Sequence, residues 1–291
     1  MNASHRQGQH GIAAVSAALD YTGNPILPRG ELFLGRDYLD HFFDGGYFRQ
    51  VGAAARSLGL SLVGVDLNGC TSSTQPESGG LEDYFVVGCL NGPVSRVIEL
   101  QGFFKAMVSV HRDRGLFTEV AGLFVKEVEK TTRFACARGF QALAITDDIA
   151  GKGGLFFSPD YFVDQVWPVY RQAARIAKEM GLRVFFHSDG DTRKVIELLI
   201  KAGYDCIHPV DAQAGLNVYD LSEEFGPRVC LMGHIDLMGW TETRIRREVE
   251  LADASFRDGG LILGSSCGIS AAVPAERLAA LYPGGHDGST P

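Results

Sequence analysis

The chain has 291 residues, of which 45% are hydrophobic and 21% charged, a balance typical of a folded protein rather than a disordered one. Its formal net charge of −8 argues against nucleic acid as a partner, because a phosphate-binding surface needs clustered lysine and arginine. No apolar run approaches the length of a membrane span, and the first residues lack the apolar core of a secretion signal, so we expect a cytoplasmic protein with no membrane partner.

Short apolar segments bounded by turn-forming residues alternate with helical patterns along the chain. Eight segments are predicted to be strands: 26–33, 60–67, 84–90, 141–148, 183–190, 205–210, 228–236 and 260–266. Eight strands alternating with helices over about 250 residues are the count expected of a (β/α)8 TIM barrel. An open doubly wound sheet is the alternative, although no G-x-G-x-x-G turn follows the first strand. We predict a single barrel domain over residues 1–291, with a short N-terminal extension and a flexible C-terminal tail.

Some helix ends can be located from residues that favour them. Ser158 precedes a proline and an aspartate and predicts a helix start directly after it. Pro168 is expected to bend this helix before it ends at Gly181. Thr241 predicts the start of a later helix. The polar segment 68–80 after the second strand is either a cover for a site or a flexible loop.

Residues able to carry chemistry stand where the predicted strands end. In a barrel these C-terminal ends meet at the mouth that holds the active site. Aspartate is also common wherever a strand meets a turn, so a structural role stays open for each residue alone. Together they predict a site for proton transfer or for a cation. They are Glu31, Asp66, Asp147, Asp148, His187, Asp189, His208, Asp211, His234, Asp236 and Cys267.

The cation interpretation depends on the fifth strand. His187 and Asp189 are two residues apart, so their side chains can point to the same side of the sheet. Cys267 follows the eighth strand, on another wall of the mouth. Imidazole, carboxylate and thiolate are all zinc ligands, and three protein ligands with an open position are the catalytic pattern. The alternative is that His187 hydrogen-bonds a neighbouring loop and that Cys267 is a small buried residue, since the six cysteines form no C-x-x-C pair.

Three of these strand ends carry a family resemblance. The segments RVFFHSDGD (183–191), RVCLMGHID (228–236) and LILGSSCGIS (261–270), within a continuous stretch over residues 84–282, resemble the uroporphyrinogen decarboxylase / corrinoid-dependent methyltransferase superfamily. The resemblance implies a (β/α)8 barrel, in agreement with the strand count.

One branch of this superfamily, the methylcobamide:coenzyme M methyltransferases, carries a zinc motif, H-x-C-G after one strand and a second cysteine after the last. His187 and Cys267 match two of these ligands, and Asp189 stands where the family has its first cysteine. The resemblance therefore implies zinc at His187, Asp189 and Cys267. It also implies a small thiol or other nucleophile that exchanges a methyl group with a corrinoid on a partner protein, and a homodimer.

Other roles follow from the same resemblance. Asp147 and Asp148 are candidates for orienting the substrate or for a fourth ligand, and Asp236 is a further catalytic candidate. His234 is either a second choice for the site or a packed barrel residue. His208 precedes a proline and is expected to be structural.

The decarboxylase branch binds a tetrapyrrole polycarboxylate with N-terminal arginines and an aspartate, and it needs no metal. Here the N-terminal segment offers only Arg6, Asp66 is the counterpart of the aspartate, and Cys267 replaces a histidine. The expected function is therefore methyl transfer at a zinc site. A metal-free lyase acting on a polycarboxylate is the alternative, and a non-catalytic partner of a corrinoid protein is a third interpretation.

Overall fold

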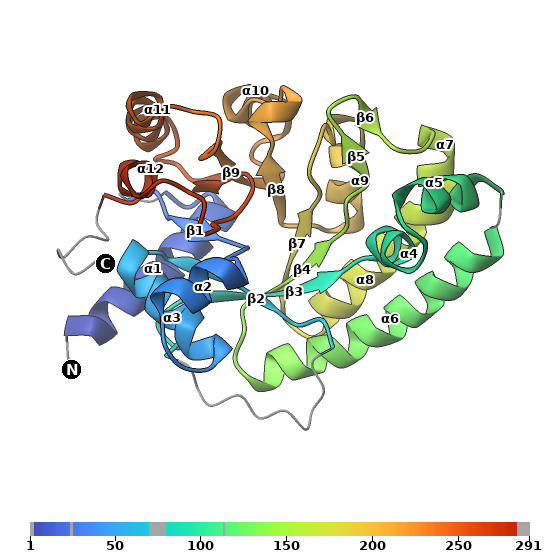
Figure 1. Cartoon of the computed structure of the whole chain (residues 1–291), viewed down its shortest axis with the longest axis horizontal. Helices are drawn as coiled ribbons and strands as arrows, with labels where there is room; N and C mark the ends of the chain where they lie inside the picture. Colours follow the sequence, from blue (N-terminus) through green and yellow to red (C-terminus); the bar gives the residue numbers. More distant parts are fainter. Residues whose placement is uncertain (1–2, 24–25, 70–79, 113, 284–291) are drawn as a thin grey trace.

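The computed structural model describes residues 3–23, 26–69, 80–112 and 114–283. Eight parallel strands form one sheet in the order β1-β2-β3-β4-β7-β8-β9-β10, with helices around it (Figure 1). They are β1 (Gly30–Glu31), β2 (Leu62–Asp66), β3 (Phe85–Asn91), β4 (Ala142–Thr146), β7 (Arg183–His187), β8 (Cys206–Val210), β9 (Cys230–Ile235) and β10 (Leu261–Ser265). Each strand lies at a predicted segment, so the predicted (β/α)8 barrel is confirmed.

The sheet closes between β1 and β10. Leu263 pairs with Arg29 in an isolated parallel bridge, and its backbone N–H donates to the carbonyl of Pro28 at 2.9 Å. The two backbones approach so closely that a Cβ at Gly264 would lie 2.0 Å from the carbonyl oxygen of Gly30. Glycine is therefore required at position 264, and this close approach lets a strand of only 2 residues complete the barrel.

Helices cover the barrel on its outer side and at one end. They are α1 (Ala3–Asp20), α2 (Arg36–Phe42), α3 (Tyr47–Leu58), α4 (Pro93–Gln101), α5 (Phe103–Arg112), α6 (Arg114–Ala137), α7 (Pro159–Tyr161), α8 (Trp167–Glu179), α9 (Arg193–Ala202), α10 (Val218–Phe225), α11 (Glu242–Ser255) and α12 (Ala275–Leu281), with a π-helical turn η1 (Phe162–Val166) and a 3-10 turn η2 (Ala212–Ala214). Two predicted boundaries are confirmed: Gly181 follows α8 with a φ of +86°, and the Thr241 side chain accepts from the backbone N–H of Arg244 at the start of α11. Within the described segments, no helix has the length and apolarity needed to cross a membrane.

The helix α1 covers the N-terminal end of the barrel. The N–H of Gly260, immediately before β10, donates to the carbonyl of Ala18 at 2.8 Å. Val15 and Leu19 of α1 pack with the side chains of the barrel interior. The helix that contains Arg6 therefore lies at the N-terminal end of the barrel. The decarboxylase interpretation needs its arginines at the opposite end, where the strands end and the active site lies.

The segment between β4 and α8 departs from the predicted pattern. A hairpin of β5 (Ala150–Gly151) and β6 (Gly154–Leu155) stands beyond the ends of β4 and β7, at the top of Figure 1. Ser158 caps the next helix as predicted, since its Oγ accepts from the N–H of Tyr161 at 3.2 Å. The predicted single helix is divided into α7, η1 and α8. The π-helical turn directly precedes the turn that contains Pro168, which has no N–H to donate.

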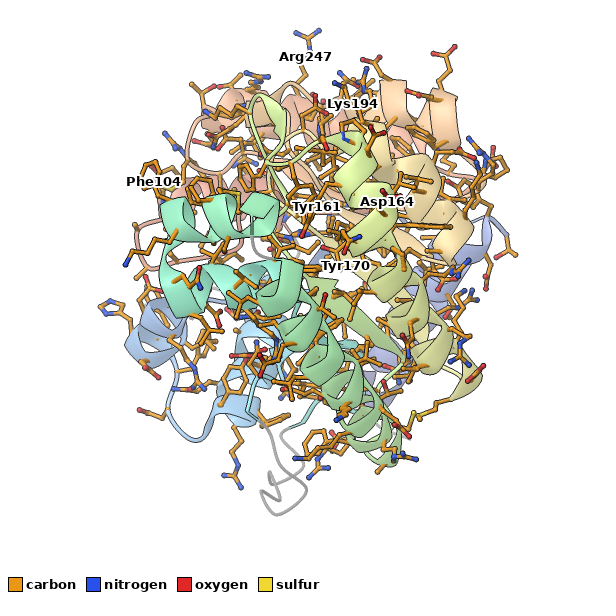
Figure 2. The ribbon with its side chains drawn as sticks, turned by 90° about the vertical axis from the view of Figure 1, so that its right-hand side faces the viewer. Phe104, Tyr161, Asp164, Tyr170, Lys194 and Arg247 are labelled. Atoms are coloured by element: carbon orange, nitrogen blue, oxygen red, sulfur yellow. The ribbon has the colours of Figure 1, made fainter. Side chains whose placement is uncertain are left out.

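Apolar side chains fill the barrel interior. They are Leu32, Leu62, Phe85, Val87, Cys89, Ala142, Ala144, Phe185, Cys206, Cys230, Met232 and Ile262. A larger core lies between the strands and the helices, where Tyr170 of α8 is fully buried, whereas Phe104 of α5 projects at the edge of the molecule and is 85% exposed (Figure 2). The cysteines at the described positions are all free, as predicted. Most of the polar segment 68–80, for which a cover and a flexible loop were the two interpretations, lies outside the described residues, at positions 70–79.

Candidate functional site

Polar side chains replace apolar ones in the last inward layer of the barrel. Asn91, Thr146, His187 and His208 are successive register partners on β3, β4, β7 and β8. Each lies two residues beyond a member of the interior cluster on its own strand and therefore faces the same side of the sheet. The sheet thus delivers a row of four polar side chains to the mouth.

His187 is the residue of this row that faces the other candidate ligands. Its ring is buried and packs edge-on against Phe33, with 4.7 Å between the ring centroids. Its Nδ1 lies 2.8 Å from Nδ1 of His208. Burial lowers the pKa of His187 to about 3, so the imidazole is neutral at pH 7. The remaining ring nitrogen, Nε2, is the atom that His187 offers to the mouth.

Two carboxylates lie beside this nitrogen. Nε2 of His187 is 3.7 Å from Oδ1 of Asp148 and 4.0 Å from Oδ1 of Asp189. One ligand atom from each of the three residues can be chosen so that all lie within 4.8 Å of one another. The two carboxylates are about half exposed, at 51% and 57% of their side-chain surface, so the group is accessible from the mouth. We call Asp148, His187 and Asp189 the cation group.

The cation group concentrates negative charge. Burial, together with the nearby carboxylates of Asp148 and Asp211, raises the pKa of Asp189 to about 7. These residues are held in place by the backbone: the N–H of Asp189 donates to Oδ1 of Asp148, and the N–H of Gly190 donates to Oδ2 of Asp211, each at 3.1 Å. Repulsion among carboxylates fixed at this spacing is relieved by a proton or by a cation.

The neighbouring aspartates 147 and 148 have separate environments. The carboxylate of Asp147 is fully buried and accepts from the N–H groups of Val94 and Ser95 and from the hydroxyl of Tyr170. It therefore caps the N-terminus of α4, and burial raises its pKa to about 6. Asp148 instead points into the cation group and is anchored by its N–H, which donates to Oγ of Ser95 at 3.1 Å. A catalytic role for Asp147 stays a prediction.

Asp236 and His234 lie at the end of β9, outside the cation group. Asp236 is buried, and its Oδ1 accepts from the N–H groups of Met238 and Gly239 at 3.0 and 2.8 Å, so it shapes the turn after the strand. His234 has a left-handed φ of +91°, and its Nε2 lies 3.1 Å from Oε1 of Glu248 on α11. His234 is thus a packed and hydrogen-bonded residue, the second of its two predicted interpretations.

Cys267 is exposed at the mouth but is not a member of the cation group. Burial raises the pKa of its thiol to about 11, and the carboxylates of Glu31, Asp236 and Asp189 act in the same direction. The structure therefore brings His187 and Asp189 together as predicted, and it adds Asp148 where the sequence-based ligand set has Cys267. A role for Cys267 as a ligand stays a prediction.

A second polar group lies on the other side of the mouth, and of its members sequence reasoning identified only Asp66. Oδ1 of Asn91 accepts from Asn68 at 3.1 Å and from Thr146 at 3.0 Å, and its Nδ2 donates to Glu99 at 2.7 Å. Nδ2 of Asn68 also donates to Asp66 at 2.7 Å. We call these five residues the amide group. Asn91 ends an apolar strand two positions after the inward Cys89, and this alternation is the signal that could have identified it.

Comparisons with known proteins place this chain in a family. A methyltransferase from Methanosarcina mazei has the same fold, with a TM-score of 0.71, 16% identity and coverage of 94% of this chain and 97% of that chain. A sugar phosphate isomerase/epimerase from Parabacteroides distasonis has a TM-score of 0.51 and 10% identity over 88% of this chain and 94% of its own. A search of curated protein sequences found no match. The sequence profile of uroporphyrinogen decarboxylase (URO-D) matches residues 80–286, well over half of the chain, so the chain belongs to the uroporphyrinogen decarboxylase family.

Proposed function

We propose that this member of the family is a methyltransferase that works with a zinc ion held by Asp148, His187 and Asp189. It would move a methyl group between a corrinoid, or a similar donor, and a small thiol or other nucleophile. The observation that carries the proposal is the cation group, in which a neutral buried imidazole presents Nε2 to two carboxylates. The fold shared with the Methanosarcina methyltransferase supports the choice of reaction class.

The residues of the cation group fit such an ion. Imidazole nitrogen and carboxylate oxygen are ordinary zinc ligands, and three protein ligands leave a position open for a substrate. The ion would supply a Lewis acid that lowers the pKa of a bound thiol. The chain's own residues perform the remaining tasks: Phe33 packs against His187 and covers one side of its ring, and the backbone N–H of Asp189 fixes the orientation of Asp148.

The same geometry disfavours the alternative reaction. A polycarboxylate substrate needs arginine or lysine at the places where its carboxylates bind. The rim around His187 carries Asp148, Asp189 and Asp211, and burial together with the repulsion from the other two carboxylates raises the pKa of Asp189. An anionic substrate would add to this repulsion, whereas a thiol facing a bound cation would not.

The partner and the assembly remain proposals from the resemblance. By the resemblance, the corrinoid donor would arrive on a partner protein that docks at the mouth. A homodimer is proposed on the same basis. Asp147 and Asp236 would then act by holding α4 and the turn after β9, through the backbone hydrogen bonds that they accept.

Metal analysis tests the proposal. Protein purified with zinc supplied should contain about one zinc ion per chain, and His187→Ala should contain almost none. His41→Ala, which changes an exposed histidine on α2, is the matched control and should keep the metal. Wild-type protein that carries no zinc under these conditions would rule out the mechanism.

A further inference from the structure

His208 is a buried residue that contacts His187 at the barrel mouth. It pairs with His187 across β7 and β8, and the two Nδ1 atoms are 2.8 Å apart. Phe33 packs against both imidazoles, with centroid distances of 4.7 and 6.0 Å. His208 is only 1% exposed, so water does not compete for this contact. The sequence-based expectation for His208 was a structural role.

A contact between two Nδ1 atoms links the tautomers of two neutral imidazoles. One Nδ1 must carry a hydrogen and donate, and the other must accept. If His187 donates, its Nε2 has a free lone pair and His208 carries its hydrogen on Nε2. If His208 donates, the hydrogen of His187 is on Nε2, facing Asp148 and Asp189, and this nitrogen cannot bind a metal. The choice between these two tautomers therefore decides whether the cation group can form.

We propose that His208 is a positioning residue that accepts the Nδ1 hydrogen of His187 and so keeps Nε2 of His187 free for a cation. This inference rests on the proposed function. Metal-bound histidines usually donate their second N–H to a carboxylate, a carbonyl or water, and here a second imidazole takes that place. The strands fix the arrangement, because the register of β7 and β8 sets the two rings side by side.

The surroundings of His208 agree with the acceptor role. Nε2 of His208 is buried and makes no hydrogen bond of normal geometry within the described residues. Burial lowers the pKa of His208 well below its usual value, so this imidazole is neutral, and the backbone of Ser265 on β10 is a neighbour of its ring. In the proposed tautomer Nε2 of His208 carries a hydrogen, and the carbonyl of Ser265 is the nearby backbone group able to accept it. The tautomer that leaves Nε2 of His187 free for a metal is thus the one in which the buried Nε2 of His208 has a hydrogen to donate.

Zinc affinity of His208 variants tests the inference. His208→Phe preserves the ring volume but removes the acceptor, and its zinc affinity should fall by about 10- to 100-fold. His208→Asn places an amide oxygen close to the former Nδ1 and should recover part of this loss. His41→Phe is the control for an exposed histidine. Competition with a chromogenic chelator gives the affinities, and thermal melting without zinc verifies that each variant is folded. An unchanged affinity in folded His208→Phe would overturn the inference.

Nuclear magnetic resonance of the wild type tests the tautomers directly, without any variant. In protein with nitrogen-15 histidine and zinc, His208 should have an unprotonated Nδ1 and a protonated Nε2, while Nδ1 of His187 carries a hydrogen. A hydrogen on Nδ1 of His208 in the zinc-bound protein would contradict the inference even if His208→Phe were misfolded. Wild-type protein that binds no zinc would instead refute the proposed function, and the assignment of His208 with it.

Discussion

The two sides of the barrel mouth differ in how the polar groups at the ends of the buried strands are paired. On the side of β2 to β4, the amide group satisfies itself, since Asn91 alone makes hydrogen bonds to Asn68, Thr146 and Glu99. On the side of β4 to β8, the cation group leaves Nε2 of His187 facing two carboxylates at 3.7 and 4.0 Å without a hydrogen bond. The first side has its hydrogen-bonding groups paired, whereas the second side offers ligand atoms to the proposed cation.

This difference separates positioning from binding. Buried polar groups are normally hydrogen-bonded, and a fully satisfied network makes a region rigid. Carboxylates held close together repel one another, and a bound cation would relieve this repulsion. We therefore expect the amide group to hold the mouth in shape and propose the cation group as the place of binding.

The largest effect is expected for Asp148→Asn. The amide keeps an oxygen that can accept from the N–H of Asp189, but it removes the negative charge that attracts a cation. Zinc affinity should fall by at least about 100-fold, equal to about 3 kcal/mol. The metal-free protein should become more stable by up to about 1 kcal/mol, because the repulsion from Asp189 is removed. Chelator competition and urea unfolding measure the two changes.

Opposite signs in these two measurements are the specific signature of a cation site. Asp191→Asn is the matched control, because Asp191 is a neighbouring carboxylate whose Oδ1 accepts from the N–H of Arg193 and lies outside the cation group. It should change zinc affinity little. If Asp148→Asn lowered stability and left zinc affinity unchanged, the cation group would have only a structural role, like the amide group.

The buried and hydrogen-bonded carboxyl group of Glu31 should make the free energy of unfolding depend on pH. Glu31 on β1 accepts from the N–H and hydroxyl of Ser265 and from the hydroxyl of Tyr282, and burial raises its pKa to about 7 from a usual 4.5. The folded protein therefore holds a proton that the unfolded chain releases. This contribution is fully present below pH 4.5 and is lost as the pH rises through 7, a loss of about 3 kcal/mol.

The Glu31→Gln variant, which resembles the neutral acid, should lack this loss between pH 5 and pH 8. Urea unfolding at the two pH values measures it. Glu276→Gln, on the exposed face of α12, is the control and should show the wild-type decline. A wild-type decline that persists in Glu31→Gln would assign the pH dependence to another group.

A smaller effect is expected in the amide group. Asn91→Ala leaves Asn68, Thr146 and Glu99 without their shared partner, and the free energy of unfolding should fall by about 2 kcal/mol. Zinc affinity should stay within about threefold of the wild type, because Asn91 is not a proposed ligand and its loss leaves the cation group intact. Glu99→Gln keeps an acceptor oxygen and is the control. A large loss of zinc affinity in Asn91→Ala would mean that the amide group also binds.

The barrel was predictable from the sequence, whereas the membership of the site was only partly so. Apolar runs bounded by turns located all eight strands, because a strand between two layers must be apolar over its length. His187 and Asp189 followed from their spacing on one strand end. The contact of His187 with His208 depends on the register of β7 and β8, and a single sequence carries no signal for a register. The divergence of Asp147 and Asp148 depends on where α4 begins, which is equally non-local.

The smallest effect is expected at Cys267, which the family motif predicts as a zinc ligand. Its sulfur is not one of the three candidate ligand atoms that lie within 4.8 Å of one another, which come from Asp148, His187 and Asp189. Burial and nearby carboxylates raise the pKa of its thiol to about 11, so a metal would have to displace a tightly held proton in order to bind this sulfur. Cys267→Ala should therefore change zinc affinity by less than about threefold, and zinc should not slow alkylation of Cys267 by iodoacetamide. A loss above about tenfold, together with protection from alkylation, would instead make Cys267 a ligand. Cys267 would then have to move towards the cation group when the ion binds, and the ligands would come from β10 as well as from β4 and β7.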